Sequence, residues 1–166
     1  MDKVKFGIAG YGKMGKIREE SILNSSDAKL ISIYEISEYS HNDKSIVQCN
    51  SFDELLTTDI DAVIVSAYVS VAADYVIRAL SRGKHVFCEK PPSMTAKEMT
   101  KVIEIEKKMG KVLKYGFNHR FHYSVMEAKK VINDGGMGKM LWMRGVYGKA
   151  GSIDFHDNWR NYKNYS

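Results

Sequence analysis

The chain has 166 residues, of which 44% are hydrophobic and 27% are charged, so it is long enough to bury a core of its own. Its net charge of +5 comes from basic residues scattered among acidic ones, which argues against a nucleic-acid-binding surface. Two cysteines and the lack of any apolar run of about 18 residues argue against a disulfide scaffold, a metal cluster and a transmembrane helix. We therefore expect a cytoplasmic protein with no metal, no membrane and no nucleic acid among its partners.

Short apolar runs alternate with helix-like segments as far as residue 133. The runs are almost free of polar residues, which is typical of parallel strands covered on both faces. Cys88 lies inside the fifth run and is interpreted as a buried structural thiol rather than a nucleophile. The sequence thus predicts a doubly wound α/β domain with a parallel sheet. The expected strands are 4–9, 30–34, 46–49, 62–66, 85–88 and 111–115.

Capping residues mark the ends of the expected helices. Ser51 and Thr95 each have a glutamate three residues further on, Glu54 and Glu98, which is the spacing of a capping box. Gly110 stops the helix that Thr95 begins. The expected helices are 13–23, a short one after Ser51, 71–81, 96–109 and 121–133.

A glycine motif, GYGKMG, follows the first expected strand and opens the first expected helix. Gly10 would permit a tight turn, Gly12 would let the backbone approach a pyrophosphate, and Gly15 would let the helix pack closely on the strand. The amides of the first helical turn, including those of Lys13 and Met14, would point at the anion. The motif in this context predicts a dinucleotide-binding Rossmann domain.

Glu35 ends the second expected strand, 20 residues after Gly15. A carboxylate at this place accepts hydrogen bonds from the adenosine ribose and repels a 2′-phosphate, and no arginine occurs in the ISEYSHND that follows. NAD is therefore favoured as the cofactor over NADP. Two alternatives stay open: a packing turn beside a chance surface glutamate, and a domain for a different adenine nucleotide.

The fifth expected strand ends in Glu89-Lys90-Pro91-Pro92, where the prolines stop the strand. Because the carboxyl ends of the strands border the cofactor crevice, Lys90 would face the nicotinamide. Lys90 could bind a substrate oxygen or act as a general acid or base, with Glu89 as the partner that orients it. The alternative is a surface Glu-Lys pair beside a proline turn.

Beyond Gly138 the character of the sequence changes. KMLWMRGVYG, residues 139–148, has the alternation and aromatic content of one long strand, whereas the remainder shows no clear periodicity. We expect residues 1–135 to form the NAD-binding domain and residues 136–166 to be the start of an incomplete α+β substrate or oligomerisation domain. An unpaired strand there would either pair with another copy of the chain, giving a homo-oligomer, or be disordered.

Four stretches together, GIAGYGKMG, the acid Glu35, RGKHVFCEKPPSMTAKE and YGFNHRFHYSV, resemble the glucose-fructose oxidoreductase, inositol dehydrogenase and rhizopine catabolism (Gfo/Idh/MocA) family. The resemblance implies oxidation or reduction at a sugar, nucleotide-sugar or cyclitol carbon with a nicotinamide cofactor. It implies that Lys90 is the catalytic or substrate-positioning lysine. It also implies that Asn118 and Glu89 lie at the cofactor and Arg120 at the substrate.

Two features of the chain differ from the family pattern. Ser66-Ala67-Tyr68 stands where the family commonly has a Thr-Pro turn, so the resemblance implies cofactor contact by these three residues. The family's second catalytic group is a histidine in a part of the family sequences beyond residue 166. His156, in IDFHDNW, is interpreted as a surface or structural histidine.

Two functions follow from these observations. The first is an NAD-dependent oxidoreductase, or its cofactor-binding fragment, that transfers a hydride at the carbinol carbon of a sugar, nucleotide sugar or cyclitol. The alternative is a non-catalytic module or sensor that binds a nicotinamide dinucleotide.

Overall fold

The computed structural model describes residues 2–146, 148 and 162, and the chain divides into two compact units with a break after Gly116. The break after Gly116 does not coincide with the domain boundary expected after residue 135. That domain boundary stays a prediction.

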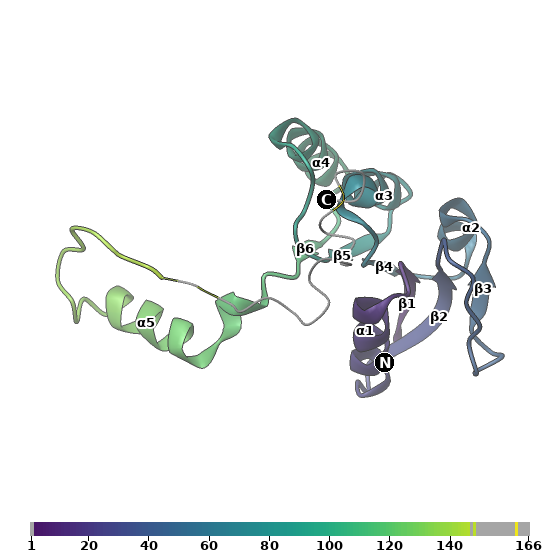
Figure 1. Ribbon diagram of the computed structural model, residues 1–166, viewed down its shortest axis with the longest axis horizontal. Coiled ribbons are helices and arrows are strands. Elements are labelled where there is room, and N and C mark those ends of the chain that lie inside the picture. Colours follow the sequence, from purple (N-terminus) through teal and green to yellow (C-terminus); the bar gives the residue numbers. More distant parts are fainter. Residues whose placement is uncertain (1, 147, 149–161, 163–166) are drawn as a thin grey trace. The chain divides into compact units, whose positions relative to one another are not determined.

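The first unit is built on a six-stranded parallel sheet with the strand order β3-β2-β1-β4-β5-β6 (Figure 1). The chain starts in the middle of the sheet, moves outward to β3, returns to β4 beside β1 and continues to the other edge. This order confirms the predicted doubly wound fold and places the change of direction between β1 and β4. The strands are β1 (Val4–Ala9), β2 (Ala28–Tyr34), β3 (Val47–Cys49), β4 (Ala62–Val65), β5 (His85–Cys88) and β6 (Leu113–Tyr115).

Helices cover both faces of the sheet, and strand residues alternate between two hydrophobic clusters. On one face Ile8, Ile33 and Ile64 pack with Ile22 of α1 (Lys13–Leu23). On the other face Val63, Val65 and Val86 pack with one or more buried residues from each of three helices. These helices are α2 (Phe52–Thr57), α3 (Val69–Ser81) and α4 (Ala96–Met109).

The capping signals explain where these helices begin and end. The capping box of α4 is complete, because the Thr95 side chain accepts from the Glu98 amide and the Glu98 carboxylate accepts from the Thr95 amide. Ser51 accepts from the Glu54 amide, but the Glu54 carboxylate accepts from the amide of Asn50 instead of Ser51. Gly110 ends α4 with a left-handed φ of 60°.

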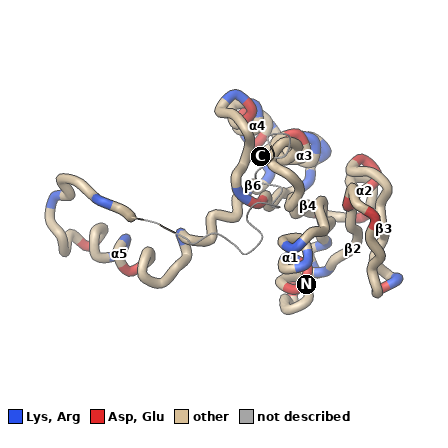
Figure 2. Tube along the Cα trace, viewed as in Figure 1, with Lys and Arg blue, Asp and Glu red and all other residues tan. Residues whose placement is uncertain are grey.

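Charge is distributed over the first unit without a single basic stripe. Figure 2 shows Lys and Arg interspersed with Asp and Glu on the helices. Ion pairs account for part of this mixture, including Lys5 with Asp59 and Arg78 with Asp53. Among the residues that the structure describes, no helix is both long enough and apolar enough to cross a membrane.

The second unit contains a 3-10 helix, η1 (Asn118–Phe121), and α5 (Tyr123–Asn133). The single helix expected over 121–133 is therefore preceded by a separate turn, and α5 starts after His122. The structure assigns no strand to residues 139–146, which corrects the expectation of a strand for this part of 139–148. A strand needs ladder hydrogen bonds to a neighbour, and alternation of side chains alone does not supply that neighbour.

Candidate functional site

The carboxyl ends of the parallel strands lie in one row across the sheet. Ala9 of β1 is in register with Tyr34 of β2 and Val65 of β4, and Val65 is in register with Cys88 of β5. Cys88 is in turn opposite Tyr115 of β6. Whatever follows each strand is therefore brought to the same edge of the sheet.

The residues that follow these strands are the ones that the sequence singled out. Backbone hydrogen bonds of 2.8 Å hold each in place: Gly10 N donates to Tyr34 O, Ser66 N to Ala9 O, and Glu89 N to Val65 O. The predicted glycine loop, the β4–α3 turn and the Glu-Lys-Pro tip are thus fixed by the ladder itself. The register explains why motifs distant in the sequence meet here.

Gly10 and Gly15 are glycines because the chain itself leaves no room for a side chain. Gly10 has φ +91°, and a Cβ there would lie 2.5 Å from the backbone nitrogen of Ala67. A Cβ on Gly15 would overlap the carbonyl oxygen of Gly10, so only glycine lets α1 approach the loop this closely. The turn and packing roles predicted for these two glycines agree with the geometry.

Gly12 differs from both of them. Its φ of −70° suits any residue, and no heavy atom of the structure lies within 4 Å of a Cβ built there. Nothing in the described fold therefore requires glycine at this position. The open space is on the loop that enters α1, where a bound group would come close to the backbone.

The amino end of α1 is available to an anion. Gly12 is the N-cap and has no side chain to accept from the first-turn amides, and the first turn carries no acidic residue. The amides that start the helix include those of Lys13 and Met14, of which Lys13 is exposed and Met14 half-buried. An uncapped helix start of this kind can hydrogen-bond a phosphate.

The Glu35 carboxylate faces the glycine loop. One oxygen accepts from the Tyr11 amide at 2.5 Å, and the other accepts from the amides of Ile36 and Ser37 at 2.8 and 3.2 Å. These bonds hold an anionic side chain beside the loop at the end of β2. The predicted pairing of a glycine loop with an acid at the next strand end is present in the structure.

Ser66 ties the β4–α3 turn to the glycine loop. Its hydroxyl donates to the carbonyl oxygen of Gly10 at 2.6 Å and lies 3.4 Å from a Cβ built on Gly15. Ala67 and Tyr68 follow as half-buried residues, and Tyr68 is the N-cap of α3. The helix starts at Val69 instead of the expected residue 71.

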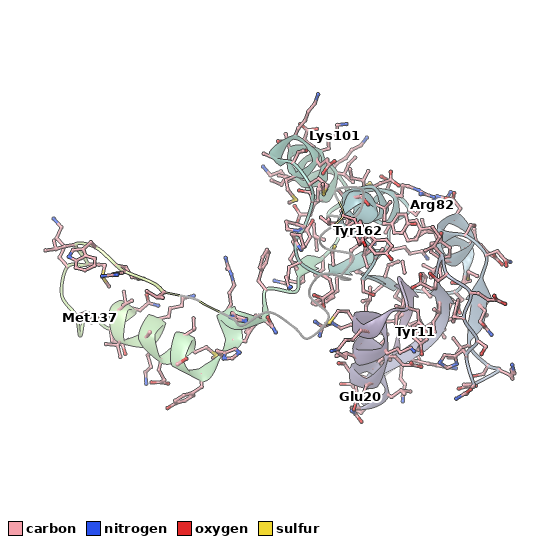
Figure 3. All side chains as sticks on the ribbon, viewed as in Figure 1. Tyr11, Glu20, Arg82, Lys101, Met137 and Tyr162 are labelled. Carbon is pink, nitrogen blue, oxygen red and sulfur yellow. The ribbon has the colours of Figure 1, made fainter. Side chains whose placement is uncertain are left out.

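A polar cluster on the glycine loop was missed by the sequence analysis. Tyr11, which lies just ahead of α1 (Figure 3), donates its hydroxyl to Glu19 of that helix. The other oxygen of Glu19 is 2.7 Å from Nε2 of His41, which comes from the loop after β2. Burial raises the pKa of the Tyr11 phenol. No sequence motif links Tyr11, Glu19 and His41. Only the folded structure shows that Glu19 and His41 hold the Tyr11 side chain in place.

The expected pairing of Glu89 with Lys90 is wrong. Glu89 Oε1 instead accepts from Nε of Arg18 on α1 at 2.9 Å, and a second guanidinium nitrogen contacts the same oxygen. Lys90 is exposed at the tip of β5, and its peptide bond to Pro91 is cis. The predicted role of Glu89 in binding the cofactor stays a prediction.

Arg18 carries a signal that could have been found in the sequence. Gly15 and Ile22 are the buried residues of α1, and Arg18 stands three residues after the first and four before the second. It therefore lies on the helical stripe that faces the sheet. A partly buried arginine needs an acidic side chain to pair with, and Glu89 is that side chain.

Cys88 is a buried thiol, 1% exposed, and burial raises its pKa to about 12 from an ordinary 9.0. The unfolded thiol ionises first, so its contribution to stability is complete below pH 9 and is lost as the pH rises toward 12. By pH 10.5 the wild type should lose about 2 kcal/mol of unfolding free energy from this group. Urea unfolding of wild type and Cys88→Ala at pH 8 and pH 10.5 measures it. The two proteins should converge at the higher pH, and parallel losses would contradict the assignment.

Asn118 and Arg120 lie on η1 in the second unit, where both are exposed. Their predicted roles at the cofactor and the substrate stay predictions. His156 lies outside the described residues.

Comparison with known proteins agrees with the fold. Residues 4–117 match the family model described as "Oxidoreductase family, NAD-binding Rossmann fold". Inositol 2-dehydrogenase of Salmonella paratyphi B is 30% identical over 159 residues, which cover 90% of this chain and 47% of that protein. Myo-inositol 2-dehydrogenase of Thermotoga maritima is 32% identical over 142 residues, covering 82% of this chain and 42% of that protein.

A solved structure gives the same result. Scyllo-inositol dehydrogenase of Lactobacillus casei, with bound NAD(H) and scyllo-inositol, superposes with a TM-score of 0.76 at 26% identity. The match covers 82% of this chain and 43% of that chain, so the present chain spans less than half the length of these relatives. The domain is of the kind that binds a nicotinamide cofactor. With a matching family model over residues 4–117 and the predicted strand order in place, the chain belongs to the Gfo/Idh/MocA oxidoreductase family.

Proposed function

We propose that this chain binds NAD along the carboxyl ends of β1, β2 and β4 and serves the oxidation of a cyclitol or sugar alcohol. The observation that carries the proposal concerns Gly12. A side chain would fit in the open space at Gly12, whereas Gly10 and Gly15 have no room for one. A residue that the fold does not need, at the start of an uncapped helix, fits a loop shaped for a pyrophosphate.

Three parts of the chain would hold the cofactor. The amides at the start of α1, including those of Lys13 and Met14, would bind the pyrophosphate. Glu35 would accept from the adenosine ribose hydroxyls while keeping its bond to the Tyr11 amide. Ser66-Ala67-Tyr68 would border the dinucleotide on the β4 side, because Ser66 is tied to the glycine loop.

The fixed carboxylate of Glu35 supports NAD over NADP. Three backbone amides hold its two oxygens, so the side chain cannot easily turn away from a 2′-phosphate. A carboxylate and a phosphate at such close range repel each other, whereas a ribose hydroxyl can donate to the same oxygen. The residues 36–43 contain no arginine that could reverse this preference.

The substrate class comes from the relatives, whose names state action on inositol, and from Lys90. A bound NAD would supply a hydride acceptor, so that a carbinol carbon could become a carbonyl carbon as its hydroxyl proton leaves. The exposed Lys90 ammonium at the tip of β5 would hold the substrate oxygen and assist the movement of that proton. Asn118 and Arg120 are proposed to serve cofactor and substrate from η1.

Calorimetric titration with NAD and with NADP tests the cofactor assignment. We expect wild type to bind NAD at least about tenfold more tightly than NADP, and Glu35→Gln to narrow this ratio by roughly tenfold. Glutamine keeps an acceptor oxygen but removes the negative charge that repels the 2′-phosphate.

Glu38→Gln is the matched control, since Glu38 is exposed in the same loop. It should leave the ratio of the two affinities unchanged. Equal binding of NAD and NADP by wild type would refute the role of Glu35, and binding of neither would refute the proposed function of this chain.

A further inference from the structure

Arg18 holds the carboxylate that precedes Lys90. Its Nε lies 2.9 Å from Glu89 Oε1, and the side chains are only 24% and 11% exposed. The guanidinium carbon also lies 4.8 Å from the centre of the Phe87 ring on β5. A charged pair this shielded from water, with a stacked guanidinium, is a stronger contact than an exposed surface pair.

Glu89 is confined on its other side by the backbone. A Cβ built on Gly116 would lie 2.8 Å from Glu89 Oε2, so the carboxylate packs against a glycine that leaves it just enough room. The amide of Gly116 is fixed by a 2.9 Å bond to Cys88 O. Arg18 and Gly116 thus enclose the carboxylate between α1 and the end of β6.

Lys90 is the next residue, and its side chain takes no part in this arrangement. It is exposed, and within the described part of the chain it has no ion pair. A lysine beside a free glutamate would spend part of its time paired with it. Here the glutamate's charge is already matched by another side chain.

We propose that Arg18 is a positioning residue that neutralises Glu89 and keeps its carboxylate off Lys90, so that the Lys90 ammonium stays available to the substrate oxygen. This inference rests on the proposed function for the role of Lys90 at the substrate. The experiment that tests it requires neither cofactor nor substrate. If Arg18 only stabilised the fold, its removal would change unfolding and leave the chemistry of the Lys90 amine as it is.

The test is the rate at which an acylating reagent labels Lys90, measured peptide by peptide with mass spectrometry at 0.15 M salt. The reagent attacks the neutral amine, so an ion pair that holds the ammonium form slows labelling. At this salt the Debye length is about 8 Å, so charges farther than this from Lys90 have little influence. In Arg18→Met, which keeps a stem over Phe87 but frees Glu89, we expect Lys90 to be labelled about two- to fivefold more slowly.

Three variants separate positioning from a general loss of structure. The double variant Arg18→Met/Glu89→Gln should return to the wild-type rate, because no carboxylate is left to pair with Lys90. Arg18→Lys, which keeps a charge for Glu89, should also stay near wild type. Lys5→Met breaks the distant pair with Asp59 and should have no effect on Lys90.

Glu89→Gln alone tests the same idea without removing Arg18. Its Lys90 rate should equal that of wild type, whereas a two- to fivefold increase would show that Glu89 pairs with Lys90 in solution and would overturn the proposal. An unchanged rate in a folded Arg18→Met would overturn it as well. Both results are independent of the NAD titration, so failure of the cofactor assignment and failure of the Arg18 assignment are told apart.

Discussion

Replacement of Gly12 by alanine is expected to weaken NAD binding about a hundredfold while leaving the chain folded. Apart from its chain neighbours, no described residue has an atom within 4 Å of the added methyl group, and the φ of −70° is ordinary, so the described fold has no reason to change. The methyl group would instead occupy the space that we assign to the pyrophosphate.

The expected loss of NAD affinity follows from the hydrogen bonds that the phosphate would lose. A phosphate that is pushed back from the start of α1 loses charge-assisted hydrogen bonds worth about 1.5–3 kcal/mol each. Losing one of them weakens binding by roughly ten- to 150-fold. Alanine is a poorer N-cap than glycine, so we allow about 1 kcal/mol of lost unfolding free energy.

The measurement is calorimetric NAD binding beside urea unfolding, on wild type and variant. Gly145→Ala is the matched control, because Gly145 also has no neighbour within 4 Å of a built Cβ and lies far along the chain from the glycine motif. It should bind NAD as wild type does. A Gly12→Ala variant with unaltered NAD affinity would falsify the placement of the pyrophosphate on this loop.

The sheet and the glycine loop could be predicted from sequence because their signals are local. A run such as AVIV is apolar throughout, which is typical of a strand covered on both faces. The three glycines, read with the strand before them and the helix after them, define one backbone path. Since parallel strands align their carboxyl ends, the meeting of Gly10, Glu35 and Ser66 followed from the fold class alone.

The partner of Glu89 could not be predicted in the same way. Arg18 is 71 residues away in sequence, and pairing across that distance depends on how α1 lies against β5. The sequence suggested a pair between Glu89 and the adjacent Lys90, and this prediction was wrong. The helical stripe of α1 was better evidence, because it places Arg18 on the side of the helix that faces the sheet.

Segments outside the sheet were also predicted less well. His122 separates η1 from α5, although the helical pattern reads as continuous from Phe121 onward. Residues 139–146 alternate like a strand but have no ladder partner in the described structure. In both places the outcome depends on neighbours that the local pattern does not specify.

Gly10→Ala is expected to lower the unfolding free energy by about 3 kcal/mol or more, a large part of the stability of a domain this size. Two costs add. The φ of +91° is unfavourable for alanine, and the new Cβ would lie 2.5–2.7 Å from backbone atoms of Ser66 and Ala67. These atoms belong to the turn that ends β4, whose Ser66 bonds to Gly10 O and Ala9 O, so they cannot give way cheaply.

Gly83→Ala separates the two costs in the same protein. Gly83 has φ +74°, but among the described residues a built Cβ there would meet only the flexible end of Lys111, at 3.8 Å. Its replacement should therefore cost about 1 kcal/mol from backbone strain alone. The difference between the two variants in urea unfolding measures the overlap at Gly10, and equal losses would mean that the glycine loop and the β4–α3 turn are not in contact. A larger loss at Gly10 would place the glycine loop and the β4–α3 turn in one rigid unit, which the proposed binding of one dinucleotide by both loops requires.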